Sequence, residues 1–316
     1  MLLNKCPVPQ WLSCVVAALG YRTYSNISVH KVVSFPETGK NVVTAVQYSK
    51  DGNFLVCGDM SGHMHIMSPD TGAILRPVKH YKRGSPAIMC MRFHPVNKYK
   101  FFVSTGNGTV YCCEANSGAS QSVATETDNV THCLDISCSG QHVITVGKDL
   151  NVRMYDSHTM TLTKIITGYV GISAPDDNLV GHALRVFGLK CHPEYDHIFI
   201  TGGWDNNLKM WDSRTEEGVV GVIPGPHICG DSIDIRGSYV VSGSWVKKNS
   251  LQLWDFNTMS LVRNIKFRQK GDGEYLYCAR FANDQTVLAG GSGTKSAQAI
   301  NFETDEVSCS RHRNLY

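Results

Sequence analysis

Residues 181–212 read GHALRVFGLKCHPEYDHIFITGGWDNNLKMWD, and the pattern of this stretch decides the fold. It opens with a short alternating apolar run and passes through a turn into a second apolar run that ends in glycine. After a tight turn, a third run closes on an aromatic residue followed by Asp. Short alternating runs separated by turn residues are typical of β-strands. The stretch therefore predicts three consecutive strands joined by tight turns.

The same unit recurs along the chain, with weaker copies on both sides of residues 181–212. The residues that close the third run lie 37 to 56 residues apart and are His30, Met67, Cys113, Tyr155, Trp211, Trp254 and Ile300. The longest step contains an additional loop, residues 169–180, whose role stays open. A β-unit of about forty residues cannot bury both of its faces alone, so the units must stack on one another.

Two dipeptides give these units a family resemblance. Gly181-His182 and Trp211-Asp212 match the signature of the WD-repeat family, and Trp254-Asp255 repeats the second half of it. The resemblance extends over nearly the whole chain and is strongest in the fourth copy. It implies a β-propeller, in which four-stranded antiparallel blades surround a central channel.

Counting the copies leads to an all-β, seven-bladed propeller of four-stranded antiparallel blades in one domain, residues 1–316. A degenerate first repeat is expected at about 11–35, and the others are expected to end near 72, 118, 160, 216, 259 and 305. The C-terminal segment 306–316 is expected to complete the first blade and close the ring. A second interpretation takes residues 11–20 as a secretory signal, in which case the mature chain begins near Tyr21.

Composition limits the class of protein. The chain has 316 residues, of which 42% are hydrophobic and 18% charged, and this excludes a disordered protein. A net charge of +3 does not indicate a dominant polyanion-binding role. Twelve cysteines are spread along the chain without zinc-type spacing, so we expect reduced core residues. We expect a cytoplasmic protein, with a nuclear one as an alternative and a secreted one as the less favoured reading.

The resemblance also implies a structural role for four polar residues in the fourth repeat. His182, Thr201, Asp205 and Trp211 occupy the positions of a buried hydrogen-bonded tetrad in the family. A hydroxyl, a His and an Asp could also suggest nucleophilic catalysis, but that chemistry needs an exposed nucleophile and an oxyanion hole. We interpret the four residues as structural.

Large aromatic side chains and one arginine fall at positions that the family places around one end of the channel. Such residues carry much of the binding energy of protein interfaces. The predicted partner-binding residues are Arg185, Phe187, Trp204, Trp245, Tyr275 and Tyr277, with Tyr21 at the edge. Alternatively, some of these rings pack on an adjacent blade or plug the channel.

The sequence thus favours a non-catalytic scaffold that binds a protein or peptide partner on the top face and works as a subunit of a larger complex. We expect no cofactor, no metal ion, no membrane association and no nucleic-acid partner. The alternative is an enzyme built on the propeller, a metal-dependent hydrolase that uses channel-facing His and Asp side chains.

Overall fold

The computed structural model describes residues 42–78, 85–168, 181–216, 218–267, 273–293 and 296–312. These residues form six antiparallel sheets of four strands, and each sheet consists of four strands consecutive in the chain. The first three blades are β1 (Val43–Tyr48), β2 (Leu55–Asp59), β3 (Met64–Met67) and β4 (Ile74–Pro77); β5 (Ile88–Phe93), β6 (Lys100–Thr105), β7 (Thr109–Glu114) and β8 (Ser120–Thr125); and β9 (Thr131–Ile136), β10 (His142–Gly147), β11 (Val152–Asp156) and β12 (Leu162–Ile166). The next three are β13 (Val186–Cys191), β14 (Ile198–Gly203), β15 (Asn207–Asp212) and β16 (Val219–Pro224); β17 (Ile233–Arg236), β18 (Tyr239–Gly243), β19 (Leu251–Asp255) and β20 (Leu261–Ile265); and β21 (Leu276–Phe281), β22 (Thr286–Gly291), β23 (Ser296–Asn301) and β24 (Val307–His312).

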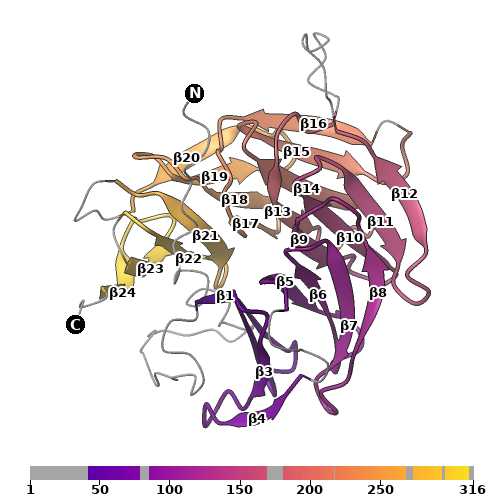
Figure 1. Ribbon diagram of the computed structural model, residues 1–316. Coiled ribbons are helices and arrows are strands. Elements are labelled where there is room, and N and C mark those ends of the chain that lie inside the picture. Colours follow the sequence, from indigo (N-terminus) through magenta and orange to yellow (C-terminus); the bar gives the residue numbers. More distant parts are fainter. Residues whose placement is uncertain are drawn as a thin grey trace, which may run out of the picture.

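The blades follow one another around a central channel. Figure 1 shows that the first strand of each blade lies innermost and the fourth lies at the outer edge. Successive inner strands pack together, β1 on β5, β5 on β9, β9 on β13, β13 on β17 and β17 on β21. Side chains on the inner strands of neighbouring blades are therefore brought together although they are distant in sequence.

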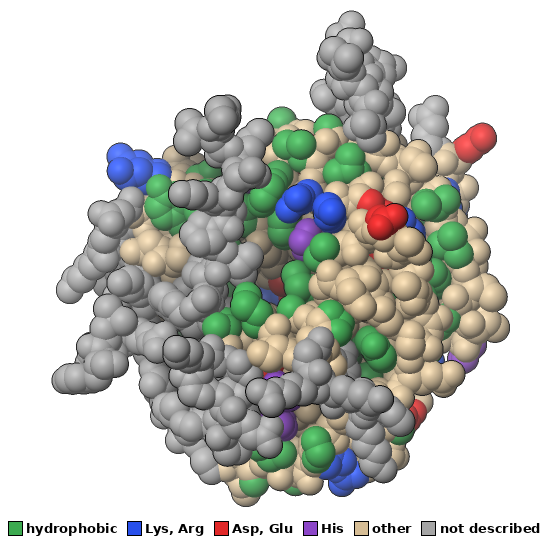
Figure 2. Space-filling model, viewed as in Figure 1, with side chains coloured by type: hydrophobic (Ala, Val, Ile, Leu, Met, Phe, Trp, Pro, Cys, Tyr) green, Lys and Arg blue, Asp and Glu red, His purple; other side chains and the backbone are tan. Residues whose placement is uncertain are grey.

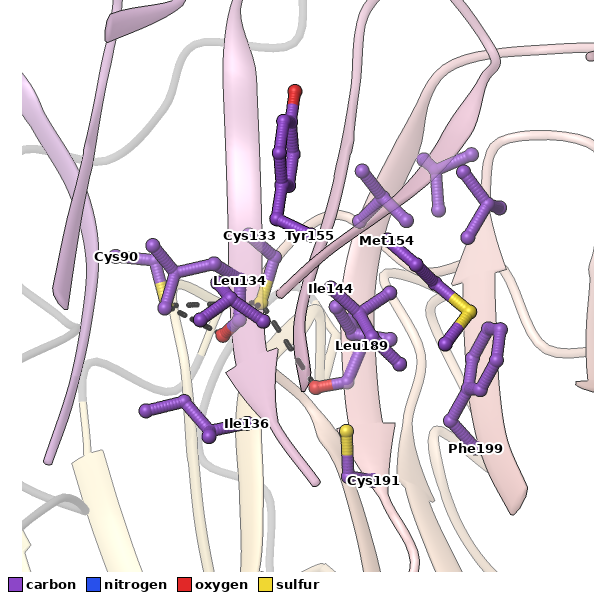
Figure 3. Close-up of a cluster of buried hydrophobic side chains, with 14 of the residues drawn as sticks. Cys90, Cys133, Leu134, Ile136, Ile144, Met154, Tyr155, Leu189, Cys191 and Phe199 are labelled. Carbon is purple, nitrogen blue, oxygen red and sulfur yellow. Dashed lines mark hydrogen bonds between the residues drawn. The ribbon is translucent and has the colours of Figure 1, made fainter. Parts of the chain in front are cut away.

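The hydrophobic core lies between the blades. In the cluster of Figure 3, Cys90 of β5 and Cys133 of β9 bring their sulfur atoms to 3.7 Å, and Leu134 packs beside them. Seven of the nine cysteines in the described ranges are buried. No helix in the described ranges is long and apolar enough to cross a bilayer. Much of the apolar content of these ranges lies in strands that pack blade against blade.

The predicted number of seven blades is wrong, because the residues that the structure describes form six. The residues assigned to the degenerate first repeat, 11–35, lie outside the described residues. The segment 306–316, which we expected to complete the first blade, instead supplies β24, the outermost strand of the sixth blade, paired with β23. Each described blade takes its four strands in chain order, so none of these strands is left over to complete another blade.

The predicted repeat ends lie at equivalent positions in the six described blades. Residues 72, 118, 160, 216, 259 and 305 all lie in the turn between the third and the outermost strand of a blade. The unit that recurs in the sequence therefore ends one strand before the blade ends. Residues 306–316 follow the last of these ends, and they provide the outermost strand of the same blade rather than the innermost strand expected to be missing from the first repeat.

Candidate functional site

One hydrogen bond recurs in all six described blades and defines one end of the channel. The residue that begins the turn between the second and third strands donates its backbone N–H to the carbonyl of a residue that precedes the inner strand. These bonds, 2.8–3.0 Å long, run from Met60 to Val42, Gly106 to Ala87, Lys148 to Val130, Trp204 to Arg185, Trp245 to His227 and Ser292 to Tyr275. The positions compared between repeats in the sequence are therefore equivalent in space at this end.

In five of the six described blades, a β-bulge turns one further residue into the channel mouth. In five inner strands the register with the second strand skips one residue, namely Thr44, Met89, His132, Phe187 and Tyr277. A bulge leaves its extra residue unpaired and redirects the side chain. The mouth is thus lined by residues of varied chemistry held by a repeated backbone feature.

Phe187 is the centre of one group of rings at this mouth. It stacks on His132 of the neighbouring blade, with ring centroids 4.2 Å apart, and packs on Trp204 at 5.0 Å. The Arg185 guanidinium lies over the Trp204 ring, 5.5 Å from its centroid. The Trp204 indole N–H donates to the sulfur of Cys229 at 3.1 Å. The Phe187 ring is therefore in contact with a ring of the neighbouring blade and with a ring of its own blade.

Trp245 is the centre of a second group. Its ring centroid lies 5.1 Å from that of Tyr275 and 6.4 Å from that of Tyr277. Tyr275 has a φ of 45°, a left-handed conformation that is uncommon for an aromatic residue. Its backbone N–H donates to Val246 O at 2.9 Å and its carbonyl accepts from Ser292 at 3.0 Å. These bonds fix the backbone from which the Tyr275 ring projects.

The two groups form one surface through His227. The backbone N–H of Trp245 donates to the backbone carbonyl of His227, and the His227 ring is parallel to that of Trp204, with the ring centroids 6.4 Å apart. We call this surface the aromatic rim, and its members are His132, Arg185, Phe187, Trp204, His227, Trp245, Tyr275 and Tyr277. Blades four to six carry most of its bulk. The first two blades offer Val42, Thr44, Met60, Ala87 and Met89 at the equivalent positions.

The rim surrounds a channel cavity of about 940 Å³. Of the predicted partner-binding residues, Phe187 and Tyr277 line this cavity, whereas Arg185, Trp204, Trp245 and Tyr275 lie outside its lining. Tyr277 is buried, and Tyr21 lies outside the described residues. Figure 2 shows hydrophobic side chains around the hollow at the centre of the face in view, with basic and histidine side chains nearby. The rings pack on one another, including contacts between adjacent blades, which is the alternative considered for these residues in the sequence. Most of them are half-buried.

The sequence reasoning missed His132, His227 and Cys229. All three occupy the same positions of the repeat as predicted residues, but the prediction was limited to Phe, Tyr, Trp and Arg, the types that most often carry interface binding energy. Burial, together with the positive charge of Arg185, lowers the pKa of His132 to about 4. His132 is therefore neutral at pH 7 and serves the rim as an aromatic ring.

The four residues assigned to the tetrad form one hydrogen-bonded chain inside the fourth blade. His182 Nδ1 lies 2.7 Å from Asp205 Oδ2, and His182 Nε2 lies 2.6 Å from Thr201 Oγ1. The Trp211 indole N–H donates to the same Thr201 oxygen at 2.6 Å. The chain is satisfied when Nδ1–H donates to Asp205 and the Thr201 hydroxyl donates to Nε2. His182 and Thr201 are fully buried, so this arrangement holds the blade together and exposes no nucleophile.

Replacing Asp205 with alanine should lower the free energy of unfolding by about 2 kcal/mol, because the buried His182 Nδ1 and the Ala183 N–H lose their acceptor. Denaturant unfolding measures the change. Asp205→Asn is the matched control, since its amide oxygen can still accept the His182 proton, and it should cost less than half as much. Equal losses in the two variants would contradict this role.

The third blade uses a buried glutamate where the fourth uses the His–Asp pair. Asn129 Nδ2 and the Thr131 hydroxyl donate to Glu126 Oε2, each at 2.7 Å. The hydroxyls of Thr145 and Tyr155 donate to Glu126 Oε1, at 2.5 and 3.0 Å. Burial and the adjacent carboxylate raise the pKa of Tyr155 well above its ordinary value, so it remains a donor.

Charged side chains occupy the middle of the channel. The residues come from five inner strands or the segments next to them, and they are Arg92, Asp135, Lys190, Asp231, Asp234 and Arg280. Both Asp231 oxygens accept from Arg92 Nη2 at 2.7 Å, and Arg280 also donates to Asp231. Lys190 Nζ lies 3.2 Å from Asp234. Three cations and three carboxylates therefore neutralise one another across the channel.

This pairing bears on the alternative of a metal-dependent hydrolase. A metal site requires carboxylates that face a cation rather than a neighbouring basic side chain. Asp135, Asp231 and Asp234 are each paired with Arg or Lys, and the described residues contain no group of three His, Cys, Asp or Glu that could hold a metal ion. The chemistry of the channel is that of a neutral ion network.

The fold and the site define a repeat propeller with a preformed aromatic rim at one channel end. Two family models match the chain, Anaphase-promoting complex subunit 4 WD40 domain over residues 23–96 and WD domain, G-beta repeat over residues 174–212. Over these two stretches the chain is similar to WD-repeat proteins.

Two curated relatives were found. The chain is 26% identical to a LEC14B homolog of Prunus armeniaca over 236 residues, which are 68% of this chain and 46% of that protein. It is 25% identical to Polycomb protein esc of Drosophila virilis over 127 residues, 36% of this chain and 29% of that protein. The chain thus spans less than half the length of either relative.

Proposed function

We propose that the protein is a non-catalytic scaffold that binds a protein or peptide segment on the aromatic rim. The observation that carries the proposal is the continuity of the rim across blades three to six, with ring contacts that are made without a partner. A preorganised surface loses little conformational entropy on binding. Aromatic residues and arginine in such a surface are the types that dominate interface energies.

The comparisons support a role within a larger assembly. One matching family model is that of a domain in a subunit of the anaphase-promoting complex. We extend the proposal to a subunit role for this chain. The cysteine spacing of the sequence supports a reducing compartment, for which we propose the cytoplasm.

The test is affinity purification with the wild-type chain beside Trp204→Ala/Trp245→Ala. Removing two rim anchors should reduce the recovery of specific partners at least tenfold. The matched control is Tyr195→Ala/Tyr239→Ala, which removes two exposed rings from the opposite end of the channel. All three proteins must show the same thermal midpoint within a few degrees. An identical set of partners for the rim variant and the wild type would refute the proposal.

A further inference from the structure

We infer that Cys90 and Cys133 are a peroxide-sensitive thiol pair, which hydrogen peroxide converts into a disulfide that joins blades two and three. The contact between the two sulfur atoms, the position of Cys90 beside the channel and the groups around it support this assignment. It is independent of any partner at the aromatic rim.

The two sulfur atoms are already in contact. Cys90 Sγ lies 3.7 Å from Cys133 Sγ, although the residues are 43 positions apart and belong to the inner strands β5 and β9 of neighbouring blades (Figure 3). Neither cysteine is part of a disulfide in the structure. Bond formation requires the sulfurs to approach by roughly 1.7 Å. Rotation of the two side chains with a slight shift of the strands can provide such an approach.

The contact has a basis in the repeat. In β5 and β9 the two cysteines directly follow the bulged residues Met89 and His132, so they hold the same position in consecutive blades. The other three described inner strands with a bulge have small residues at this position, namely Ala45, Gly188 and Cys278. Among these five strands, only β5 and β9 are neighbours that both carry a thiol there.

Cys90 is the thiol that an oxidant in the channel meets first. It contributes to the lining of the channel cavity, whereas Cys133 lies outside that lining. Cys90 is only 3% exposed and Cys133 is 1% exposed. So small an exposed fraction excludes a bulky oxidant such as a disulfide-bonded peptide. Hydrogen peroxide is little larger than water, and it is the oxidant that fits this access.

The surroundings of Cys90 favour its thiolate, which is the nucleophilic form of cysteine. The hydrogen bond with Cys133 lowers the pKa of Cys90, and the charge of Arg92 on the same strand acts in the same direction. Burial and the Asp231 carboxylate oppose these effects without outweighing them. The same hydrogen bond, together with burial, raises the pKa of Cys133 well above its ordinary value. Cys90 is therefore the reacting thiol, and Cys133 keeps its proton until the second step.

The oxidation proceeds in two steps. The Cys90 thiolate attacks one oxygen of hydrogen peroxide, the O–O bond breaks, and the leaving hydroxide takes up the proton that Cys90 released. The product is a sulfenic acid on Cys90 and one water. The Cys133 sulfur then attacks the Cys90 sulfur, the S–O bond breaks, and the leaving hydroxide takes the Cys133 proton. Two thiols are thus oxidised to one disulfide, and hydrogen peroxide is reduced to two waters.

The test uses the full-length protein, reduced, freed of reductant and treated with a small molar excess of hydrogen peroxide. The protein is then denatured, its remaining thiols are blocked with N-ethylmaleimide, and its peptides are analysed by tandem mass spectrometry without reduction. We expect a peptide pair linked through Cys90 and Cys133, and two fewer blocked thiols per chain. The disulfide closes a loop that spans 43 positions, so the thermal midpoint should rise by about 5 °C and return to its original value after reduction.

Two serine variants separate the roles of the thiols. In Cys133→Ser the hydroxyl can still donate to Cys90, so peroxide should leave Cys90 as a sulfenic acid that dimedone labels after denaturation. In Cys90→Ser, peroxide should leave Cys133 unlabelled. The matched control is Cys278→Ser, which changes the cysteine at the same position of the sixth blade, and it should form the link as the wild type does.

The wild-type measurement decides the inference without relying on the folding of any variant. Full blocking of Cys90 and Cys133 by N-ethylmaleimide after peroxide treatment would overturn it. A link that forms equally fast in concentrated urea would also overturn it, because the native contact would then play no part. Dimedone on Cys133 in the Cys90→Ser protein, with none on Cys90 in Cys133→Ser, would overturn the assignment of Cys90 as the reacting thiol.

Discussion

Glu126→Ala should lower the free energy of unfolding by about 3–5 kcal/mol, the cost of breaking a buried charged network by removing one partner. The Glu126 side chain is completely buried and accepts four side-chain hydrogen bonds. Alanine leaves these donors in an interior from which water is largely excluded, where each unsatisfied group costs about 1–3 kcal/mol. The individual costs do not add, because the donors share one site.

Urea unfolding followed by circular dichroism measures this loss. The matched control is Glu303→Ala, in the exposed turn before β24, where the backbone makes the hydrogen bonds and the side chain makes none that the structure records. That variant should stay within about 0.5 kcal/mol of the wild type. Glu126→Gln keeps the shape and one acceptor oxygen, so it should fall between the two. A Glu126→Ala protein within 1 kcal/mol of the wild type would show that Glu126 does not anchor the blade.

Glu126 also shows where prediction from the sequence ends. The tetrad of the fourth blade could be predicted, because its four residue types stand at the family spacings around Trp211. The third blade keeps a hydroxyl and an aromatic ring at Thr145 and Tyr155 but takes its acceptor from Thr125-Glu126-Thr127-Asp128, a segment that reads as a solvated turn. Only the packing of the blade buries Glu126, and a sequence pattern does not show that burial.

The number of blades could not be predicted from the repeat pattern, for a different reason. The repeated sequence pattern identifies groups of three strands. It does not show which end of the chain supplies the remaining strand of a blade. The turn from β23 to β24 has only five residues, and a short hairpin closes at a small loss of chain entropy. Pairing of residues 306–316 with the first repeat would have joined the two ends of the chain. The local hairpin is what the structure shows.

At the rim, the residue types were predictable and their mutual contacts were not. The positions of Phe187 and Trp204 within the repeat predicted that both lie at one end of the channel. The contact of Phe187 with His132 depends on bulges in two different blades, and nothing in the residue types of the two strands signals a bulge. Inter-blade contacts of this kind require the structure.

Arg92→Ala should lower the free energy of unfolding by about 3 kcal/mol. The guanidinium donates to both Asp231 oxygens at 2.7 Å, and its Nε lies 3.5 Å from Asp135. Arg92 and Asp135 are each about nine-tenths buried, whereas Asp231 is 38% exposed to the channel. Solvent in the channel reduces the loss below that of a fully enclosed pair. Arg236→Ala, which breaks a surface pair with the exposed Asp284, is the control and should cost less than 1 kcal/mol.

The dependence of this loss on pH distinguishes an ionic role for Arg92 from simple packing. Burial alone would raise the pKa of Asp231, but the charges of Arg280 and Arg92 outweigh it and hold that pKa well below the ordinary 3.8. A carboxyl with a lowered folded-state pKa contributes stability above its unfolded pKa, and this contribution is lost as the pH falls through the folded value. The unfolded-state pKa is the same in both proteins, so the difference in unfolding free energy between wild type and Arg92→Ala should be constant from pH 5 to 7 and shrink in acid, as the pH falls toward the lowered folded-state pKa of Asp231. A difference that keeps its full size down to the lowest pH at which both proteins still fold would mean that Arg92 acts through the packing of its aliphatic stem, and the ion network would then not be what joins the inner strands across the channel.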